Sequence, residues 1–227
     1  MIKSLTLLKK KAGLTREEFL RHWKEIHGPL AAKMIPERRK YMQCHPIETP
    51  GVELGIDGIA EFWWDDLRSY QNYITWRKSK EAKVLVEDEK KFIDMSTMVR
   101  VFAEEKVIVE GESLIMKSFH MLKRKAGLTR EEFLRYWKDK HGPLEAKMLT
   151  GRRKYVQCHP ISAKVPGVEF EIDGVAEFWW DDLKSYQNYI TWRQSNDAKV
   201  LMEDEGKFID MSQMSSFFGE EKVITEG

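Results

Sequence analysis

The sequence predicts an α+β fold with two ferredoxin-like domains in tandem, each with the element order strand, helix, strand, strand, helix, strand (βαββαβ). Two observations support this prediction. The chain of 227 residues is an internal duplication, since the segment at 14–30 recurs almost unaltered at 128–144. Within each copy, short alternating apolar runs surround two segments of helical periodicity in the order that defines the split βαββαβ unit. Two long copies favour two similar domains over a solenoid of short repeats.

The two copies are related by a nearly constant shift in numbering. LTREEFLRHWKEIHGPL at 14–30 corresponds to LTREEFLRYWKDKHGPL at 128–144, which is an offset of 114 residues. The offset becomes 116 after the loop that follows Ile47, because the second copy has two extra residues there. Each copy contains about half of the 227 residues, enough to bury a core of its own. We therefore predict domains at 1–109 and 110–227.

The first helix of each copy has clear start and stop signals. In the first copy Thr15 stands at the N-cap position with Glu18 three residues later, which is the capping-box pattern. Gly28 and Pro29 are expected to end the helix, because glycine tolerates a left-handed C-cap and proline cannot continue the hydrogen-bond ladder. His27 is then expected in the last turn, where the helix dipole favours a cation.

Alternation along the second strand predicts which side chains it turns toward the helices. In the first copy the strands are expected at 2–8, 39–46, 57–63 and 95–102, with a short extension at 106–109. Met42 and Cys44 of the second strand are the pair suited to a surface under helices. Tyr41, Gln43 and His45 are therefore expected on the opposite face. The cysteine of each copy is expected to be buried and to form no disulfide.

The third strand divides its side chains in the same way. Gly58, Ala60 and Phe62 form a small and apolar set that suits helix packing. The opposite face is expected to carry Asp57, Ile59, Glu61 and Trp63. That second face is therefore polar and aromatic at once.

A second helix completes the cover on one face of the sheet. Asp65 and Asp66 are candidate N-caps, and the helical pattern breaks near Ser79 before it resumes to about Val86. With both helices on one face, the antiparallel sheet leaves its other face bare. We expect the two bare faces of the chain to close on each other, which gives an intramolecular pseudo-dimer.

The predicted linker allows this closure. It runs from Val107 to Ser113 and has seven residues, which at about 3.3 Å per residue span at most ~23 Å. A fused chain also gives the two halves an effective concentration that no free pair has. The alternative is that each half pairs with a second chain, and further homo-oligomer formation is compatible with both arrangements.

Composition and charge exclude several classes of partner. Lys and Arg total 38 against 37 for Asp and Glu, so the chain has no excess positive charge for nucleic acid or anionic lipid. The N-terminal MIKSLTLLKKKAG has an apolar run too short to span a membrane and no small-residue cleavage site. We therefore expect a cytoplasmic protein that binds neither nucleic acid nor membrane. The eight Trp, seven Tyr and 11 Phe residues fill a core or line a cavity for a small hydrophobic molecule.

Four segments of the first copy resemble the EthD family, named from bacterial degradation of ethyl tert-butyl ether, within the dimeric α+β barrel superfamily. They are LTREEFLRHWKEIHGPL, RKYMQCH, DGIAEFWWD and EDEKKFID, and each recurs with small changes in the second copy. The resemblance covers nearly all of each copy. It implies a barrel with a hydrophobic pocket between sheet and helices, and, because single-copy members pair as dimers, a fused pseudo-dimer. Relatives include dehydrating enzymes, lactone isomerases, monooxygenases and haem enzymes, so the fold does not name the reaction.

Comparison of the two copies selects the candidate catalytic residues. A histidine beside a carboxylate is a suitable proton-transfer pair, and a tyrosine hydroxyl can hold a carbonyl or enolate oxygen. The candidate catalytic residues are His27, His45 and Tyr41, with their counterparts His141, His159 and Tyr155. The candidate substrate-binding residues are Gln43, Asp57, Glu61 and Trp63, their counterparts Gln157, Asp173, Glu177 and Trp179, and His120, which replaces Thr6. The structural alternative is that Tyr41 and His45 satisfy each other and that His27 only caps a helix end.

We expect no metal and no cofactor. The sequence has no histidine or cysteine pair at metal-ligand spacing, no phosphate-binding glycine loop and no GlyXaaSerXaaGly elbow. A metal held by His27, His45 and Asp57 after folding, or haem on His27 or His45, is the alternative left open.

Three functions agree with these residues. The first is a cofactor-free lyase or isomerase, dehydratase-like and acting by general acid-base catalysis, whose substrate is a small hydrophobic carbonyl compound of aromatic, polyketide-like or xenobiotic origin. The second is a non-catalytic small-molecule-binding accessory protein of a degradation pathway. The third is a monooxygenase of the α+β barrel type.

Overall fold

The computed structural model describes residues 1–47, 55–111, 116–149, 151–161 and 172–226. The chain divides into two compact units. Unit 1 contains Met1–Glu104, Ile161–Glu169 and Glu221–Gly227, and unit 2 contains Glu105–Pro160 and Phe170–Glu220. The strands at 99–109 and 215–226 are each divided between the two units, and each is described below with the unit in which it begins. The loop after Ile47, its counterpart in the second copy and the end of the predicted linker lie outside the described residues. The division after residue 109 and the closure of the two sheets stay predictions.

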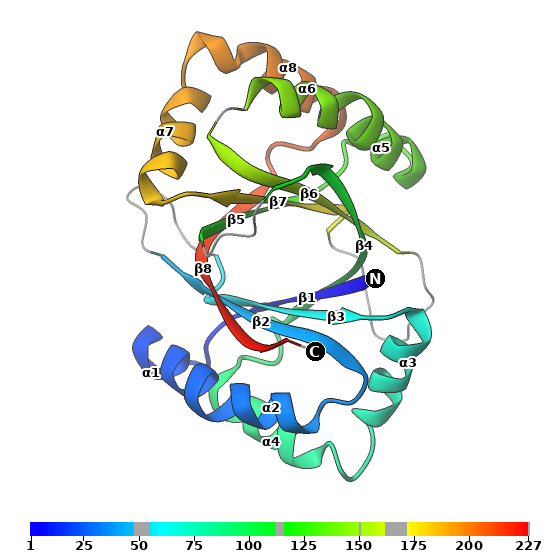
Figure 1. Cartoon of the computed structure of the whole chain (residues 1–227), viewed down its shortest axis with the longest axis vertical. Coiled ribbons are helices and arrows are strands. Elements are labelled where there is room, and N and C mark those ends of the chain that lie inside the picture. The colour runs from blue at the N-terminus through cyan, green and yellow to red at the C-terminus, as the bar shows by residue number, and fades with distance from the viewer. Residues whose placement is uncertain (48–54, 112–115, 150, 162–171, 227) are drawn as a thin grey trace. The chain divides into compact units, whose positions relative to one another are not determined.

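Unit 1 is an antiparallel sheet with helices on one face, as the βαββαβ order predicts (Figure 1). Its strands are β1 (Ile2–Leu8), β2 (Arg38–Pro46), β3 (Gly58–Trp64) and β4 (Val99–Val109), in the order β4-β1-β3-β2. Its helices are α1 (Arg16–Arg21), η1 (His22–His27), α2 (Gly28–Met34), α3 (Leu67–Trp76) and α4 (Lys83–Phe92). β4 is one strand where the sequence predicted a strand and a separate extension, because no glycine or proline interrupts it.

Unit 2 repeats this arrangement with the strand order β8-β5-β7-β6. Its strands are β5 (Met116–Leu122), β6 (Arg152–Pro160), β7 (Gly174–Trp180) and β8 (Ser215–Glu226). Its helices are α5 (Arg130–Tyr136), η2 (Trp137–His141), α6 (Gly142–Met148), α7 (Leu183–Arg193), the short η3 (Asn196–Ala198) and α8 (Lys199–Phe208). The duplicated sequence therefore gives two sheets of the same topology.

The predicted capping boxes form in both units. The Thr15 hydroxyl accepts a hydrogen bond from the Glu18 N–H at 3.1 Å, and the Glu18 carboxylate accepts one from the Thr15 N–H at 2.8 Å. Thr129 and Glu132 form the same pair at 3.2 and 2.8 Å. A cap of this kind stabilises a helix by about 0.5–2 kcal/mol and fixes where α1 and α5 begin.

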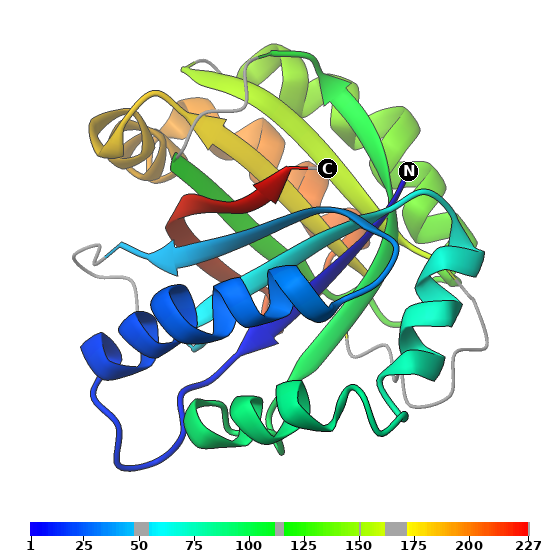
Figure 2. The same ribbon diagram turned by 60° about the horizontal axis from the view of Figure 1, so that its bottom comes forward.

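The first helix does not end at Gly28 and Pro29, which corrects the prediction. α1, the π-helical turn η1 and α2 follow one another as a continuous helix (blue in Figure 2). The N–H of Gly28 donates to the carbonyl of Trp23, five residues earlier. Pro29 falls in the first turn of α2, where a missing N–H leaves no hydrogen bond unmade. His27 therefore lies in the middle of a longer helix.

Gly28 is needed for space and not for a left-handed backbone. Its φ of −54° is an ordinary helical value. A Cβ at this position would lie 3.0 Å from Gln43 Nε2 and 3.2 Å from the Trp23 carbonyl oxygen. The glycine thus lets the helix come close to β2, and Gly142 does the same in unit 2, where a Cβ would lie 2.9 Å from a glutamine nitrogen.

The faces predicted for the second strand are wrong, whereas those of the third are confirmed. Tyr41 lies opposite Phe62 and Gln43 opposite Ala60, and directly opposed residues of an antiparallel pair share a face. Phe62 and Ala60 belong to the core under the helices, and Tyr41 belongs to it as well. The polar second strand therefore turns its tyrosine, glutamine and histidine toward the helices.

A tryptophan of the helix explains why polar side chains are tolerated there. The indole N–H of Trp23 donates to Tyr41 Oη at 3.1 Å, and its ring stacks on His45 with 5.0 Å between ring centres. The polar atoms on this face are therefore satisfied by one another and by the helix. Met42 and Cys44 face away from the helices. The thiols of both copies are buried and form no disulfide among the described residues, as predicted.

Gly58 and Gly174 let the same tryptophan ring lie on the sheet in each unit. A Cβ at Gly58 would lie 2.4 Å from Trp23 Cζ3, and one at Gly174 would lie 2.4 Å from Trp137 Cζ3. Both tryptophans are 1% exposed. The close contact between helix and sheet therefore depends on two glycines in β3 and β7.

We predict that Gly174→Ala destabilises the protein by about 1–3 kcal/mol, because the added methyl group overpacks the contact with Trp137. Thermal unfolding followed by circular dichroism measures the effect as a lower Tm. Gly206→Ala is the matched control: a Cβ there meets nothing within 4 Å, and replacing a glycine inside α8 should stabilise by up to about 1 kcal/mol. Equal Tm values for the two variants would contradict the argument.

Candidate functional site

A cavity lies between the sheet and the helices of unit 2. Its volume is about 290 Å³, near the lower end of the usual range for small-molecule sites. Its apolar wall includes Leu122, Trp137, Phe178, Tyr189, Ile190 and Met202. Its polar groups are His120, His141, Glu145, Arg193, Gln194, Glu205 and Ser216. An apolar cavity with a few converging polar groups is the usual form of a ligand-binding or active site.

His141 and Glu145 stand side by side at the wall of this cavity. His141 ends the π-helical turn η2, and Glu145 lies one turn further along in α6. His141 Nδ1 lies 2.9 Å from Asp204 Oδ2, and its Nε2 lies 3.4 Å from Glu145 Oε2. Because Asp204 binds one ring nitrogen, the other is directed toward Glu145. Both His141 and Glu145 are almost fully buried.

The two groups stabilise each other's charged forms. Burial lowers the pKa of His141, but the hydrogen bond and charge of Glu145, together with Asp204, outweigh burial and raise that pKa above its ordinary value. Burial raises the pKa of Glu145, but the hydrogen bond and charge of His141 outweigh it and lower that pKa overall. Near neutral pH the site therefore favours an imidazolium beside a carboxylate.

A second carboxylate, Glu205, is already held by an arginine. Arg193 Nη2 donates to Glu205 Oε2 at 2.7 Å, and Arg193 Nη1 donates to Oε1. The same two-pronged pair occurs in unit 1, where Arg77 donates twice to Glu89 at 2.6 Å. A bidentate pair of this kind fixes both side chains. We therefore regard it as a structural support of the cavity in both units.

The corresponding space in unit 1 is almost filled, with a volume of about 30 Å³. The positions occupied by His120, Glu145 and Ser216 in unit 2 are occupied by Thr6, Ala31 and Arg100 in unit 1. The long side chain of Arg100 lines what remains of the space. Unit 1 therefore keeps the histidine but lacks both the open volume and the neighbouring carboxylate.

His27 of unit 1 has the opposite pKa shift to His141. Its Nδ1 lies 3.0 Å from Asp88 Oδ2, which is the same contact that His141 makes with Asp204. Burial lowers the pKa of His27, and the charges of Glu89 and Asp88 compensate only in part. Two differences separate the sites: position 31 carries alanine, and the charge of His22 lowers the pKa of His27 where unit 2 has Tyr136.

His120 is the cavity residue with an unsatisfied ring nitrogen. It lies on β5 opposite Ser216 of β8, and its Nδ1 is 2.8 Å from Ser216 Oγ. Its Nε2 is buried and has no hydrogen-bond partner in the part of the chain that the structure describes. Burial, with the nearby positive charge of Arg193, lowers the pKa of His120 to about 4. The ring is therefore neutral at ordinary pH.

Tyr155, Gln157 and His159 form a buried network with Trp137 beside the cavity. The Trp137 indole N–H donates to Tyr155 Oη at 3.1 Å, and Gln157 Nε2 lies 2.9 Å from the same oxygen and 3.1 Å from the Trp137 carbonyl oxygen. His159 Nε2 lies 2.9 Å from Gln157 Oε1, and its ring stacks on the indole. Unit 1 repeats the network with Tyr41, Gln43 and His45. Their catalytic and binding roles stay predictions.

Asp57 and Asp173 directly precede β3 and β7 and are absent from the residues that line the two cavities. Asp57 Oδ2 accepts a hydrogen bond from the backbone N–H of Lys10 at 2.9 Å. Asp173 accepts one from the backbone N–H of Arg124 at 3.0 Å and is paired with Arg130 at 3.0 Å. Both carboxylates hold a backbone segment in place, and their predicted binding role is untested.

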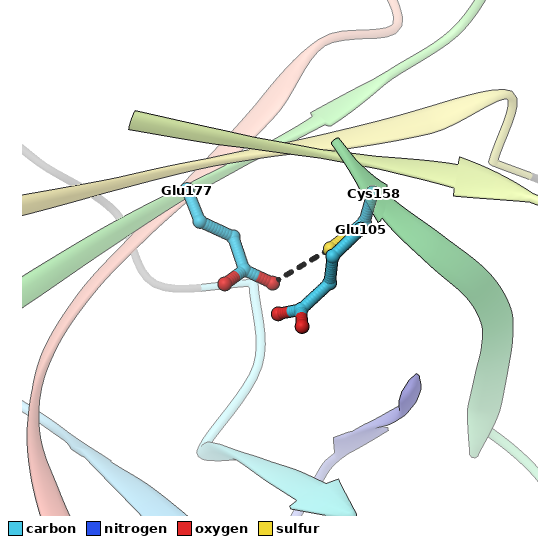
Figure 3. Close-up of side chains that lie close together, drawn as sticks. All are labelled: Glu105, Cys158 and Glu177. Atoms are coloured by element: carbon cyan, nitrogen blue, oxygen red, sulfur yellow. Dashed lines mark hydrogen bonds between the residues drawn. The ribbon is translucent and has the colours of Figure 1, made fainter. Parts of the chain in front are cut away.

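Glu177, Trp179 and Cys158 lie on the face of the unit 2 sheet turned away from the helices. Glu177 is 2.7 Å from the buried ammonium of Lys117, which lies 4.2 Å from the Trp179 ring centre. The thiol of Cys158 donates to Glu177 at 3.0 Å, with Glu105 close by (Figure 3). In unit 1 Lys3, Glu61 and Trp63 have the corresponding arrangement. Their predicted role in substrate binding is likewise untested.

Two groups of three residues in the described ranges have ligand atoms within 4.8 Å of one another, as a metal site requires. They are His141, Glu145 and Glu205, and Glu105, Cys158 and Glu177. In each group a cation already neutralises one carboxylate, since Arg193 holds Glu205 and Lys117 holds Glu177. We therefore assign a metal to neither group.

The metal and haem alternatives of the first copy find no support in the geometry. His27 contacts Asp88, His45 contacts Gln43, and Asp57 holds the backbone before α1. The three side chains therefore take part in separate contacts. A volume of about 30 Å³ beside His27 also leaves no room for a haem macrocycle.

Sequence reasoning missed Glu145, Ser216, Arg193 and Glu205. Comparison of the two copies, which identifies His120, could also have identified Glu145. This residue replaces Ala31 within a segment that is otherwise nearly unchanged between the copies. Ser216 was also within reach, since Arg100 stands in its place. Arg193 and Glu205 have the equivalents Arg77 and Glu89 in the first copy, and their pattern is typical of an ordinary charged helix surface. Only the fold brings them together.

Comparison with known proteins agrees with this architecture. The model of the EthD domain matches residues 11–96 and 125–212. In structure the chain is similar to an anthrone oxidase-like protein, with 11% identity, a TM-score of 0.66 and coverage of 99% of this chain and 94% of that one. A mutant chlorite dismutase from Candidatus Nitrospira defluvii has 10% identity and a TM-score of 0.54, with coverage of 98% and 92%. An EthD family protein from Bacillus halodurans C-125 has 24% identity and a TM-score of 0.38, with coverage of 47% and 99%.

The two similarities that cover nearly the whole chain confirm the predicted fold class, tandem ferredoxin-like domains of the dimeric α+β barrel type. No curated protein sequence matched the chain. Among the described residues, every helix is too short or too polar to cross a membrane.

We predict that the pKa values of His27 and His141 respond oppositely to exchange of one residue between the copies. Glu145→Ala should lower the pKa of His141 below its ordinary value, as in unit 1, because the neighbouring carboxylate is lost. Ala31→Glu should raise the pKa of His27 above its ordinary value. Titration of the histidine Cε1–H signals by NMR measures both, with the exposed Glu203→Ala as control. Unchanged values in both variants would show that Glu145 does not control these histidines.

Proposed function

Because the chain belongs to the EthD family and carries two EthD domains, we propose that its second half acts on a small hydrophobic carbonyl compound by cofactor-free proton transfer. One observation supports this most directly: His141 and Glu145 are buried as a 3.4 Å pair at the wall of a cavity of about 290 Å³. A positioned acid and base in an apolar cavity is the arrangement that general acid-base catalysis requires. The reaction class is that of a lyase or isomerase.

Glu145 serves as the base in this proposal. Its carboxylate is ionised near neutral pH and lines the cavity, so it can take a proton from the carbon next to a carbonyl group. His141, as the imidazolium, serves as the acid. If it protonates a departing hydroxyl group, the product is an alkene and water. If the proton returns to another carbon, the product is an isomer.

The network around Trp137 supports this pair. Tyr155 contributes a hydrogen bond that helps to keep Glu145 ionised, and Gln157 and His159 hold Tyr155 and the indole in place. Asp204 keeps the His141 ring oriented. We assign these four residues a positioning role, in which they act through His141 and Glu145.

A second candidate is oxygenation of the same deprotonated substrate by O₂. Removal of a proton next to a carbonyl gives an electron-rich enolate, which is also the starting point for cofactor-free oxygenation. The similarity to an anthrone oxidase-like protein favours this alternative. Binding without turnover, as in an accessory protein, is the third outcome. Product analysis with and without O₂ separates all three.

We predict that Glu145→Gln lowers proton exchange on bound ketones by about 10²-fold or more, the usual contribution of a general base. The measurement is deuterium uptake from D₂O at the carbon next to the carbonyl, followed by NMR over a panel of aryl ketones. Glu203→Gln, the same change at an exposed position of α8, is the control and should exchange at the wild-type rate. Exchange by wild-type protein no faster than in buffer would favour the binding protein. Equal exchange by both variants would remove Glu145 from the mechanism.

A further inference from the structure

We propose that His120 binds the oxygen atom of the substrate by donating a hydrogen bond from Nε2, and that the substrate class is a neutral, enolisable ketone carried on one or two rings. This inference rests on the proposed function, because it names the substrate class and the residue that orients it. It comes from a buried polar atom that the described part of the chain leaves without a hydrogen-bond partner.

The unsatisfied atom is His120 Nε2. The residue is 8% exposed and lines the unit 2 cavity, and Nε2 has no hydrogen-bond partner among the described residues. Leaving a buried polar atom without a partner is unfavourable, because the atom has lost its hydrogen bond to water. A ligand oxygen in the cavity would remove that cost. The position is specific to the second copy, since Thr6 occupies it in the first.

The proposal places the proton of the His120 ring on Nε2. A neutral imidazole has one N–H and one acceptor nitrogen, and burial keeps His120 neutral. The hydroxyl of Ser216 can donate to Nδ1 at 2.8 Å, which leaves the proton on Nε2. A neutral N–H donor suits a carbonyl oxygen and, more strongly, the enolate oxygen that forms when a base removes a proton.

The charges around the cavity favour a neutral ligand. The guanidinium of Arg193 is bound to Glu205, and His141 is bound to Asp204 and Glu145. Among the cavity residues that the structure describes, these two cations are therefore already neutralised. An anionic ligand would enter beside Glu145 without a new partner, and its desolvation would be unfavourable.

The volume and the aromatic walls of the cavity determine the size of the ligand and the kind of group attached to its carbonyl. A volume of about 290 Å³ holds one or two rings but not a long chain. Phe178 and Tyr189 lie edge-on to the His120 ring, with 5.5 and 6.3 Å between ring centres. A ring attached to the carbonyl would therefore lie among aromatic side chains while its oxygen reaches His120.

A matched set of probes tests this assignment in the intact chain. 1-Tetralone, its hydrocarbon analogue tetralin and the anion 1-naphthoate are titrated into wild-type protein, His120→Thr and Thr6→Ala. We expect wild type and Thr6→Ala to bind 1-tetralone about 10-fold more tightly than tetralin, the ratio that one buried hydrogen bond gives. His120→Thr should bind the two nearly equally, and 1-naphthoate should bind no better than tetralin.

A second measurement keeps the test independent of how well the variant folds. In wild-type protein with ¹⁵N-labelled histidine, 1-tetralone should shift the His120 Nε2 signal and tetralin should not. Equal binding of 1-tetralone and tetralin by wild type, a retained preference in His120→Thr, or preferential binding of 1-naphthoate would each overturn the assignment. If the preference holds but Glu145→Gln leaves proton exchange unchanged, only the proposed reaction fails. If exchange depends on Glu145 but the preference is absent, only the role of His120 fails.

Discussion

The carbonyl oxygen of Trp137 accepts two hydrogen bonds, one from the backbone N–H of Gly142 and one from Gln157 Nε2 on the sheet. The first closes the π-helical turn, and the second fixes that turn on β6. The indole ring meanwhile lies against Gly174 at a distance that leaves no space for a Cβ. His141 directly precedes Gly142, so this anchor fixes the backbone from which its ring extends. Unit 1 has the same anchor at Trp23.

The two copies therefore differ in chemistry and not in scaffold. A buried carboxylate at position 145 is tolerated because His141 and Tyr155 bind it, whereas an uncompensated charge there would be strongly unfavourable. The alanine at position 31 requires no such partner. A further exchange, at positions 100 and 216, places a long arginine side chain in the lining of the unit 1 space where unit 2 has a serine.

Much of the fold was predictable from the sequence, because capping boxes, strand alternation and the duplication itself are local signals. The helix end was not. Gly28 and Pro29 are ordinary stop signals, and the hydrogen bond that carries the helix past them comes from a wider turn that no composition pattern marks. The predicted faces of the second strand are inverted, because the apolar pair Met42 and Cys44 is expected under the helices and the polar side chains lie there instead. Pairing Tyr41 with Phe62 across the strands would have corrected this. The polar partners of the site, Asp204 and Arg193, come from distant elements, so only tertiary structure brings them to the cavity.

Arg100 has a consequence for the binding stoichiometry of the chain. Its side chain lies where the smaller Ser216 leaves space in the other copy. In the first half, the space that a ligand would need is therefore partly taken by the protein itself. A saturation experiment on this chain should then reach one equivalent, even though the sequence contains the same domain twice. Such a stoichiometry would result from the sequence differences between the two halves. It would not require negative cooperativity, in which binding at one site weakens binding at a second site.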